Sequence, residues 1–450
     1  MKILKGLLML TLFAVLLFVI RYAWVSLPIM SGFTAKNMCS CVFIGGRADS
    51  SVAAEELSDF PLSLAAYEID KANKSVTSTV LGMAKKKAIY RPGFGCTLVN
   101  EITEEAIRNQ PLRLILMMPA DMGNQPINFI TTSVDTTRLN KIMQEHVEHT
   151  NNKKQHEARA IVVMYDGKLL AEHYAPGFDK NSRMLGWSMA KSVTSALVGI
   201  LVKQGKLDVN NPAPVPEWAD AKDKRHAITL QHLLQQTSGL HFEENYNKYS
   251  DATRMLFNKA DMAAYTASRP LKVAPGTQFY YSSGNSNILS RIVRQTVGNS
   301  NYYSIIYDSL FHKLGMYSAV IEPDASGTMV GSSYVFATAR DWARFGLLYY
   351  NNGIVNGQQL FTGDWVKQTI TPFAADKLQH YGYQFWLNGF NKEMPSQRKF
   401  PAAPADMFYA DGYAGQYVFI IPSKKLVIVR LGFKNFDENK LLGKILACVK

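Results

Sequence analysis

The sequence has little of several residue classes, and each shortage excludes a group of functions. Charged residues make up only 19% of the 450 residues, and no run of Lys and Arg interleaved with aromatic residues suggests a nucleic-acid groove. No His-Glu-x-x-His sequence occurs, and the glycines around Gly93 are not followed by the Lys-Ser/Thr of a phosphate loop. These shortages argue against a nucleic-acid partner, a zinc-protease centre and a nucleotide-binding loop.

Cysteine is scarce, with only Cys39, Cys41, Cys96 and Cys448 in the chain. The Cys39-x-Cys41 pair is not followed by a second close pair, so a structural zinc site is not indicated. In an exported protein a disulfide is permitted, and Cys96 paired with Cys39 or Cys41 would tie down the N-terminal region. The sequence leaves all three complete pairings open.

Long hydrophobic runs are also rare, and the clearest one lies at the N-terminus. Lys2 and Lys5 precede an uncharged run from Gly6 to Ile20, which Arg21 ends. This pattern predicts a signal anchor or signal peptide in segment 1–30. No clean small-x-small cleavage site follows, which favours an uncleaved membrane anchor. The domain behind it would then lie in the periplasm or outside the cell, and the net charge of +13 suits anionic lipid surfaces.

The length of the chain predicts more than one structural unit. Residues 31–155 contain short strand-like pieces at 64–69 and 76–81, with the lysines at 85–87 expected between strands. No catalytic pattern occurs there, and the region has no assigned role. Residues 156–450 form the second unit, which carries every candidate site residue. Nothing in the sequence indicates the oligomeric state.

Strand patterns begin and end the second unit. The hairpin patterns are Ala158–Tyr165 with Lys168–Tyr174, and Tyr417–Ile421 with Leu426–Phe433. Asp166 and Gly167 suit a two-residue type I′ turn between the first pair. Helical patterns such as 230–236 and 338–350 lie between the hairpins, and a closing helix is expected over 440–449. We therefore expect an α/β fold of the α+β type. An antiparallel sheet shared by both ends would be flanked by helices, with an inserted all-helical subdomain.

A serine and a lysine open the most apolar helical pattern of the chain. Ser188 and Lys191 are three residues apart, so they share one helix face, and the pattern continues through Val193, Leu197 and Ile200. Burial disfavours an ammonium and lowers the pKa of a lysine. A neutral lysine can take the proton of a serine hydroxyl, so Ser188 is the candidate nucleophile and Lys191 its candidate base.

A second Ser-x-x-Lys pattern, Ser396 with Lys399, lies in a proline- and charge-rich stretch. No apolar helix follows it, so nothing would desolvate its lysine. We interpret it as a surface loop.

Two later segments could complete a site around Ser188. Tyr281 offers a phenol for proton transfer, and Ser283 and Asn285 could hydrogen-bond the site from the start of the next helix. Gly412 to Gln416 leads into the strand that begins at residue 417, and glycine at a strand edge lets a substrate lie close to the backbone.

Together these residues resemble the penicillin-recognising serine hydrolases, which include class C β-lactamases, family VIII esterases and 6-aminohexanoate-dimer hydrolases. The segments that carry the resemblance are Ser188-Met189-Ala190-Lys191, Tyr281-Ser282-Ser283, Tyr413-Ala414-Gly415, Leu233–Leu240 and Ala337–Gly346. The resemblance covers roughly residues 158–450. Trp187–Lys191 and Gly412–Gln416 look most similar to the 6-aminohexanoate-dimer-hydrolase branch.

The resemblance implies a role for each residue. Ser188 would form an acyl-enzyme, and Lys191 with Tyr281 would move the proton. The oxyanion and the substrate would be held by the backbone N–H of Ser188, by Gly415 and Gln416, and by Ser283, Asn285 and Tyr413. No metal or organic cofactor is implied.

The sequence also departs from this family. Tyr413 and Ala414 stand where β-lactamases carry a cation and a hydroxyl that hold the substrate carboxylate, and Ser283 stands where an asparagine is usual. These differences favour a small-molecule or short peptide-like amide or ester over a β-lactam. A catalytically weak substrate-binding or sensor protein that retains the fold is the alternative.

Overall fold

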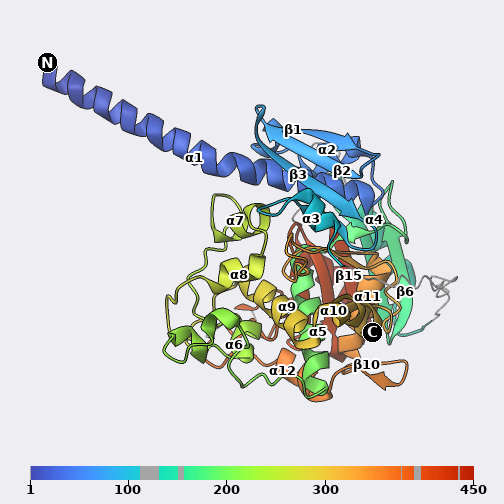
Figure 1. Ribbon diagram of the computed structural model, residues 1–450. Helices are drawn as coiled ribbons and strands as arrows, with labels where there is room; N and C mark the ends of the chain where they lie inside the picture. Colours follow the sequence, from blue (N-terminus) through green and yellow to red (C-terminus); the bar gives the residue numbers. More distant parts are fainter. Residues whose placement is uncertain (1, 112–130, 151–156, 377, 390–396, 434–435) are drawn as a thin grey trace.

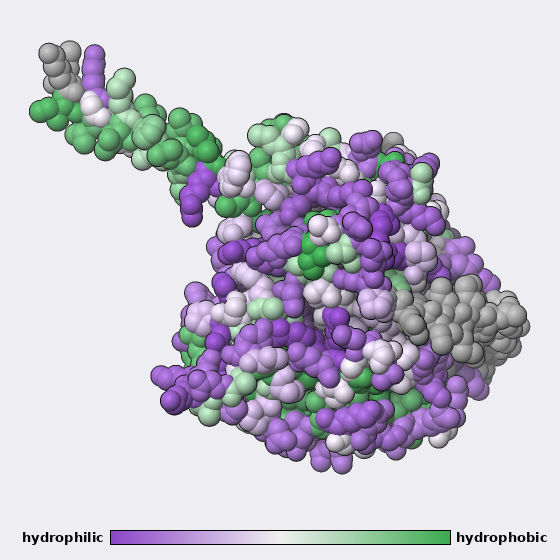
Figure 2. All heavy atoms as spheres, in the orientation of Figure 1, coloured by the Kyte–Doolittle hydropathy of each residue, from purple (hydrophilic) through white to green (hydrophobic). Residues whose placement is uncertain are grey.

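The N-terminus of the protein is one long helix, α1 (Lys2–Phe43), that projects from the body (Figure 1). The computed structural model describes every residue except 1, 112–130, 151–156, 377, 390–396 and 434–435. Residues 3–20 of α1 are exposed and strongly apolar (Figure 2), whereas most of its residues from Ser31 to Cys41 are buried in the body. Among the described residues, α1 is the one helix long and apolar enough to cross a membrane.

A four-stranded antiparallel sheet, ordered β1-β2-β3-β4, packs on the buried half of α1. Its strands are Ala65–Asp70, Ser75–Val80, Met83–Arg91 and Gly95–Leu98. The first two lie within a residue of the pieces expected at 64–69 and 76–81. The expectation for residues 85–87 is wrong, because these lysines lie inside β3. Short helices α2 (Asp49–Glu56) and α3 (Glu104–Arg108) complete this region.

Two buried links fix α1 to the rest of the protein. A disulfide joins Cys39 of α1 to Cys96 of β4, while Cys41 and Cys448 are buried free thiols. The Lys36 ammonium of α1 forms a buried ion pair with Glu322, 2.5 Å away. The buried half of α1 is therefore an integral part of the body.

The central sheet contains six antiparallel strands, ordered β12-β13-β14-β15-β5-β6. Their bounds are Trp386–Leu387, Phe408–Gly412, Gln416–Ile421, Leu426–Gly432, Ala158–Tyr165 and Lys168–Tyr174. β15 pairs with β5, so the sheet joins the two ends of the second unit. The expected shared antiparallel sheet is thus confirmed, and Asp166 and Gly167 both have positive φ at the predicted turn.

Helices cover both faces of this sheet. Along β5, Val162 faces the core that contains α11 (Ala339–Tyr350), whereas Ile161 and Val163 face the core that contains α4 (Thr136–Glu148) and α13 (Glu438–Leu446). Burial of both faces explains why the strands read as nearly continuous apolar runs. Gly346 of α11 has no side chain to hold the helix off the sheet, because a Cβ there would meet Val427 at 2.5 Å.

Besides α11, seven α-helices of the described chain lie between β6 and β12. They are α5 (Ala190–Lys203), α6 (Leu230–Leu234), α7 (Asp251–Asn258), α8 (Met262–Ala267), α9 (Ser283–Val297), α10 (Asn299–Ile306) and α12 (Gly363–Thr369). α5 packs directly on α9. A small sheet is ordered β7-β9-β8 (Met184–Leu185, Val335–Ala337 and Val320–Ile321), and its strand β7 lies just before the turn that leads into α5.

Candidate active site

Ser188 lies in a tight turn directly before α5. The turn, Trp187–Met189, is a single 3₁₀ turn, and α5 begins at Ala190. Trp187 has a φ of 47°, a left-handed conformation that bulky residues rarely adopt. Strained backbone of this kind persists only where surrounding packing enforces it, and it clusters at functional sites.

Packing enforces the conformation of Trp187 from three sides. Its indole stacks on Phe33 of α1 at 6.2 Å between ring centroids, and it also contacts Tyr334 at 6.2 Å and Tyr413 at 5.7 Å. The anchor-like helix therefore reaches the residue next to the candidate nucleophile.

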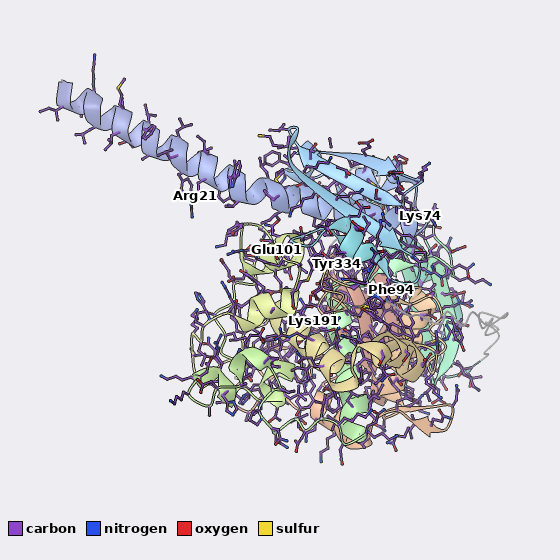
Figure 3. All side chains as sticks on the ribbon, in the orientation of Figure 1. Arg21, Lys74, Phe94, Glu101, Lys191 and Tyr334 are labelled. Carbon is purple, nitrogen blue, oxygen red and sulfur yellow. A yellow bond between two sulfur atoms is a disulfide. The ribbon has the colours of Figure 1, made fainter. Side chains whose placement is uncertain are left out.

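Lys191 lies in the first turn of α5 and is 1% exposed (Figure 3). Its Nζ donates to Ser188 Oγ at 2.9 Å, to Ser283 Oγ at 3.0 Å and to the backbone carbonyl of Ser332 at 2.9 Å. Burial lowers the pKa of Lys191 to about 8, although the negative charges of Glu244 and Asp411 act in the opposite direction. A substantial part of this lysine is therefore neutral near physiological pH.

Tyr281 forms the wall beside this pair. Its ring lies 4.9 Å from Lys191 Nζ, stacks on Trp386 and contacts Tyr381 edge-on. Burial raises the pKa of Tyr281 well above its usual range, and its hydrogen bond with Ser188 offsets only part of that effect. Tyr281 is thus held as a neutral phenol, so Lys191 is the better base of the two.

Ser283 links Lys191 to two residues that the sequence gave no reason to select. Its backbone N–H and its hydroxyl donate to Glu244 at 2.8 and 2.6 Å, and its hydroxyl oxygen lies 2.8 Å from Tyr246. Tyr246 also donates to Glu244 at 2.7 Å. Glu244 and Tyr246 belong to a loop without periodic pattern, so only the folded chain brings them to Lys191.

The side-chain amides of Asn285 and Gln416 form hydrogen bonds with neighbouring side chains and with the backbone. Asn285 is buried and bonds to Gln236 and Ser238. The Gln416 amide bonds in both directions to the backbone of Gly432, at 2.7 and 3.0 Å. The structure therefore brings Ser283 to the lysine, while these two amides stabilise the walls of the site.

The glycine-edged strand passes directly beside the nucleophile turn. β13 ends at Gly412, and residues 413–415 form the turn before β14. A Cβ at Gly412 would lie 2.2 Å from the carbonyl oxygen of Gly186, so only glycine allows this approach. Gly415 has a φ of 83° within the turn. Tyr413 is 68% exposed.

The second Ser-x-x-Lys pattern is only partly placed, since Ser396 lies outside the described residues. Lys399 is half exposed and forms an ion pair with Asp411 at 3.2 Å. Its ammonium lies beside aromatic rings, including that of Phe400 at 5.2 Å, but it is far less buried than Lys191, which is 1% exposed.

Comparison with known proteins identifies the family of the chain. Residues 139–440, about two thirds of the chain, match the family described as beta-lactamase. The chain belongs to the beta-lactamase family. The match spans every residue of the site except those contributed by α1, and it confirms the resemblance noted from the sequence.

One curated relative and two solved structures show the same fold. A 6-aminohexanoate-dimer hydrolase of Paenarthrobacter ureafaciens is 27% identical over 297 residues, which is 60% of this chain and 71% of that one. A family VIII carboxylesterase structure superposes with a TM-score of 0.55 at 15% identity, covering 70% of this chain and 97% of that one. A class C beta-lactamase gives 0.54 at 17% identity, with coverage of 71% and 99%.

Proposed function

We propose that this protein is a serine hydrolase that cleaves amide or ester bonds through an acyl-enzyme on Ser188. One observation carries the proposal: Lys191 Nζ lies 2.9 Å from Ser188 Oγ in a pocket that lowers the pKa of the lysine to about 8. A nucleophile and a base within hydrogen-bonding distance are the minimum for this chemistry.

In the acylation step, neutral Lys191 takes the proton of Ser188 as Oγ attacks the substrate carbonyl carbon. The tetrahedral intermediate then collapses and the bond to the leaving group breaks. The leaving amine or alcohol receives the proton from Lys191, with the Tyr281 phenol as the relay, because Tyr281 remains protonated. The acyl group stays on Ser188 as an ester.

Deacylation follows the same path in reverse. A water molecule gives one proton to Lys191 and attacks the acyl carbon, and the Ser188–acyl bond breaks. The proton returns to Ser188 Oγ, and the acid product leaves. Ser188 and Lys191 are thereby restored, and one water molecule has been consumed.

The oxyanion would be held by two backbone N–H groups, those of Ser188 and Gln416. Two contacts support this assignment. Gly412 lies against the carbonyl of Gly186, which holds the strand edge beside the nucleophile turn, and the Gln416 side chain is fixed on Gly432. Preorganised donors of this kind contribute much of the rate in acyl transfer.

Retention of the complete Ser188–Lys191–Tyr281 set favours an enzyme over a binding or sensor protein, which has no need of a desolvated lysine beside a serine. The relative named 6-aminohexanoate-dimer hydrolase makes amides the first substrates to test, with esters beside them. The exposed Tyr413 at the position of the family cation argues against β-lactams.

The exposed apolar part of α1 supports an uncleaved membrane anchor with the catalytic domain outside the cytoplasm. The helix continues without a break into the body, where Cys39 is joined to Cys96, and a disulfide fits an oxidising compartment. Carbonate extraction of membranes should leave the full-length chain in the pellet, whereas a shortened chain in the soluble fraction would indicate a cleaved signal.

Labelling with a fluorophosphonate probe tests the catalytic proposal. The intact protein should be labelled, Ser188→Ala should not, and Lys191→Ala should be labelled slower by a factor of about 100 or more. Ser396→Ala is the control and should behave as the parent protein. Full labelling of Ser188→Ala would show that another residue is the nucleophile.

A further inference from the structure

A cavity of about 770 Å³ runs from the catalytic serine to helix α1. It is lined at one end by Ser188 and Tyr246 and along its side by Tyr22, Ser26, Met30 and Phe33 of α1. A short polar substrate needs much less room than this, and it gains nothing from a wall made by the anchor helix.

The cavity follows α1 for a considerable length. Phe33 stacks on Trp187, the neighbour of Ser188, so it marks the catalytic end. Tyr22 lies eleven residues earlier, which is about 16 Å along a helix at 1.5 Å per residue. The apolar side chains of Leu256 and Phe257 on α7 contribute to the same lining. The space is therefore long, apolar and parallel to the helix.

The end of the cavity away from Ser188 lies beside Tyr22, where the exposed apolar segment of α1 ends. Residues 3–20 are exposed, and their eighteen residues span about 27 Å, close to the roughly 30 Å hydrocarbon core of a bilayer. Arg21 ends the segment (Figure 3). Tyr22 and Trp24 follow it and are 48% and 80% exposed, as is typical of aromatic residues at a membrane surface. Phe60, 81% exposed, also lines the cavity.

We infer that the substrate is an amphiphile of the membrane that holds α1, with its acyl chain in this cavity and its ester or amide carbonyl at Ser188. The inference rests on the proposed function, and it adds the substrate class. α1 then has two parts in sequence: an apolar segment in the bilayer, and a cavity wall that receives a chain leaving that bilayer next to Tyr22. The buried ion pair of Lys36 and the Cys39–Cys96 disulfide hold this wall in place.

Dependence on acyl-chain length is the first test. The full chain in phosphatidylcholine vesicles should hydrolyse p-nitrophenyl dodecanoate with a higher kcat/KM than the butyrate, by up to about fourfold for each methylene that enters the cavity. Ala23 of α1 lines the cavity, so Ala23→Trp should lower kcat/KM for the dodecanoate by about tenfold or more and leave the butyrate nearly unchanged. Val19→Trp, on the exposed apolar segment, is the matched control and should preserve the preference.

Delivery from the membrane is tested with umbelliferyl oleate. The ester should be consumed when it shares vesicles with the protein and should be consumed much more slowly when it is placed in separate, protein-free vesicles. Equal rates for both presentations, or no gain with chain length while the butyrate is hydrolysed, would overturn the inference and leave the proposed function intact.

A binding readout separates the two proposals when activity is absent. A photoreactive dodecanoic acid in the vesicles should label peptides containing residues 22–33 and 253–257, in both the parent and Ser188→Ala. Ala23→Trp should reduce this labelling, and Val19→Trp should not. Labelling without any ester or amide hydrolysis would refute the serine hydrolase but not the acyl cavity. Labelling that is equally strong in Ala23→Trp and in the parent would refute the cavity.

Discussion

The proposed acylation should depend on pH through Lys191, because a lysine can act as the base only when it is neutral. Its ordinary pKa is 10.5, and burial lowers it to about 8. At pH 7 the neutral fraction therefore rises from about 1 in 3,000 to about 1 in 10, a gain of roughly 300-fold. Acylation should increase about tenfold per pH unit below pH 7 and level off above pH 8 to 9.

The rate of fluorophosphonate labelling measures this dependence on the free enzyme, without a contribution from product release. The charges of Glu244 and Asp411 raise the pKa of Lys191, so removing either should move the midpoint of the profile to lower pH. Asp411→Asn is the cleaner variant, because Glu244 also accepts two hydrogen bonds from Ser283. A flat profile between pH 6 and 9, or a midpoint near the ordinary pKa of lysine, would refute the assignment of Lys191 as the base.

Three further substitutions test other parts of the structure. Tyr281→Phe should lower kcat by roughly 100-fold or more, because the leaving group loses its proton relay, while circular dichroism stays unchanged. Gly412→Ala should lower fluorophosphonate labelling and thermal stability together, since its Cβ would lie 2.2 Å from the Gly186 carbonyl oxygen; an unaffected variant would show that the strand edge can shift. Glu322→Gln should destabilise the fold by about 3–5 kcal/mol, because the Lys36 charge is left buried without its partner; thermal unfolding should show partial recovery when Lys36→Met is added.

The central fold could be predicted because its signals are local. Asp166-Gly167 between two strand-like runs specifies a hairpin, and the apolar pattern after Lys191 specifies a buried helix. Both elements are observed at the expected residues. The pairing of the first and last strands followed from the order of strand and helix patterns, which leaves few arrangements for an antiparallel sheet.

The parts that escaped prediction depend on tertiary contacts. Glu244 and Tyr246 reach Ser283 only because their loop folds over the start of α9. Lysines 85–87 looked like a break between strands, yet β3 carries them because their neighbours Ala88 and Ile89 are buried in that strand. Charge alone is a weak signal against a strand when its other residues are buried.

The contacts of the N-terminal helix with the body are also tertiary, so the sequence alone could not predict them. The sequence indicates an anchor in segment 1–30, but the helix continues to Phe43, and its Phe33 packs against the residue before the candidate nucleophile. A simple tether needs no contact with the site, no buried ion pair and no disulfide into the body. Since α1 has all three, moving the anchor would also move Trp187, whose strained φ of 47° depends on its ring neighbours. The buried half of α1 and the turn that carries Ser188 are therefore one mechanical unit.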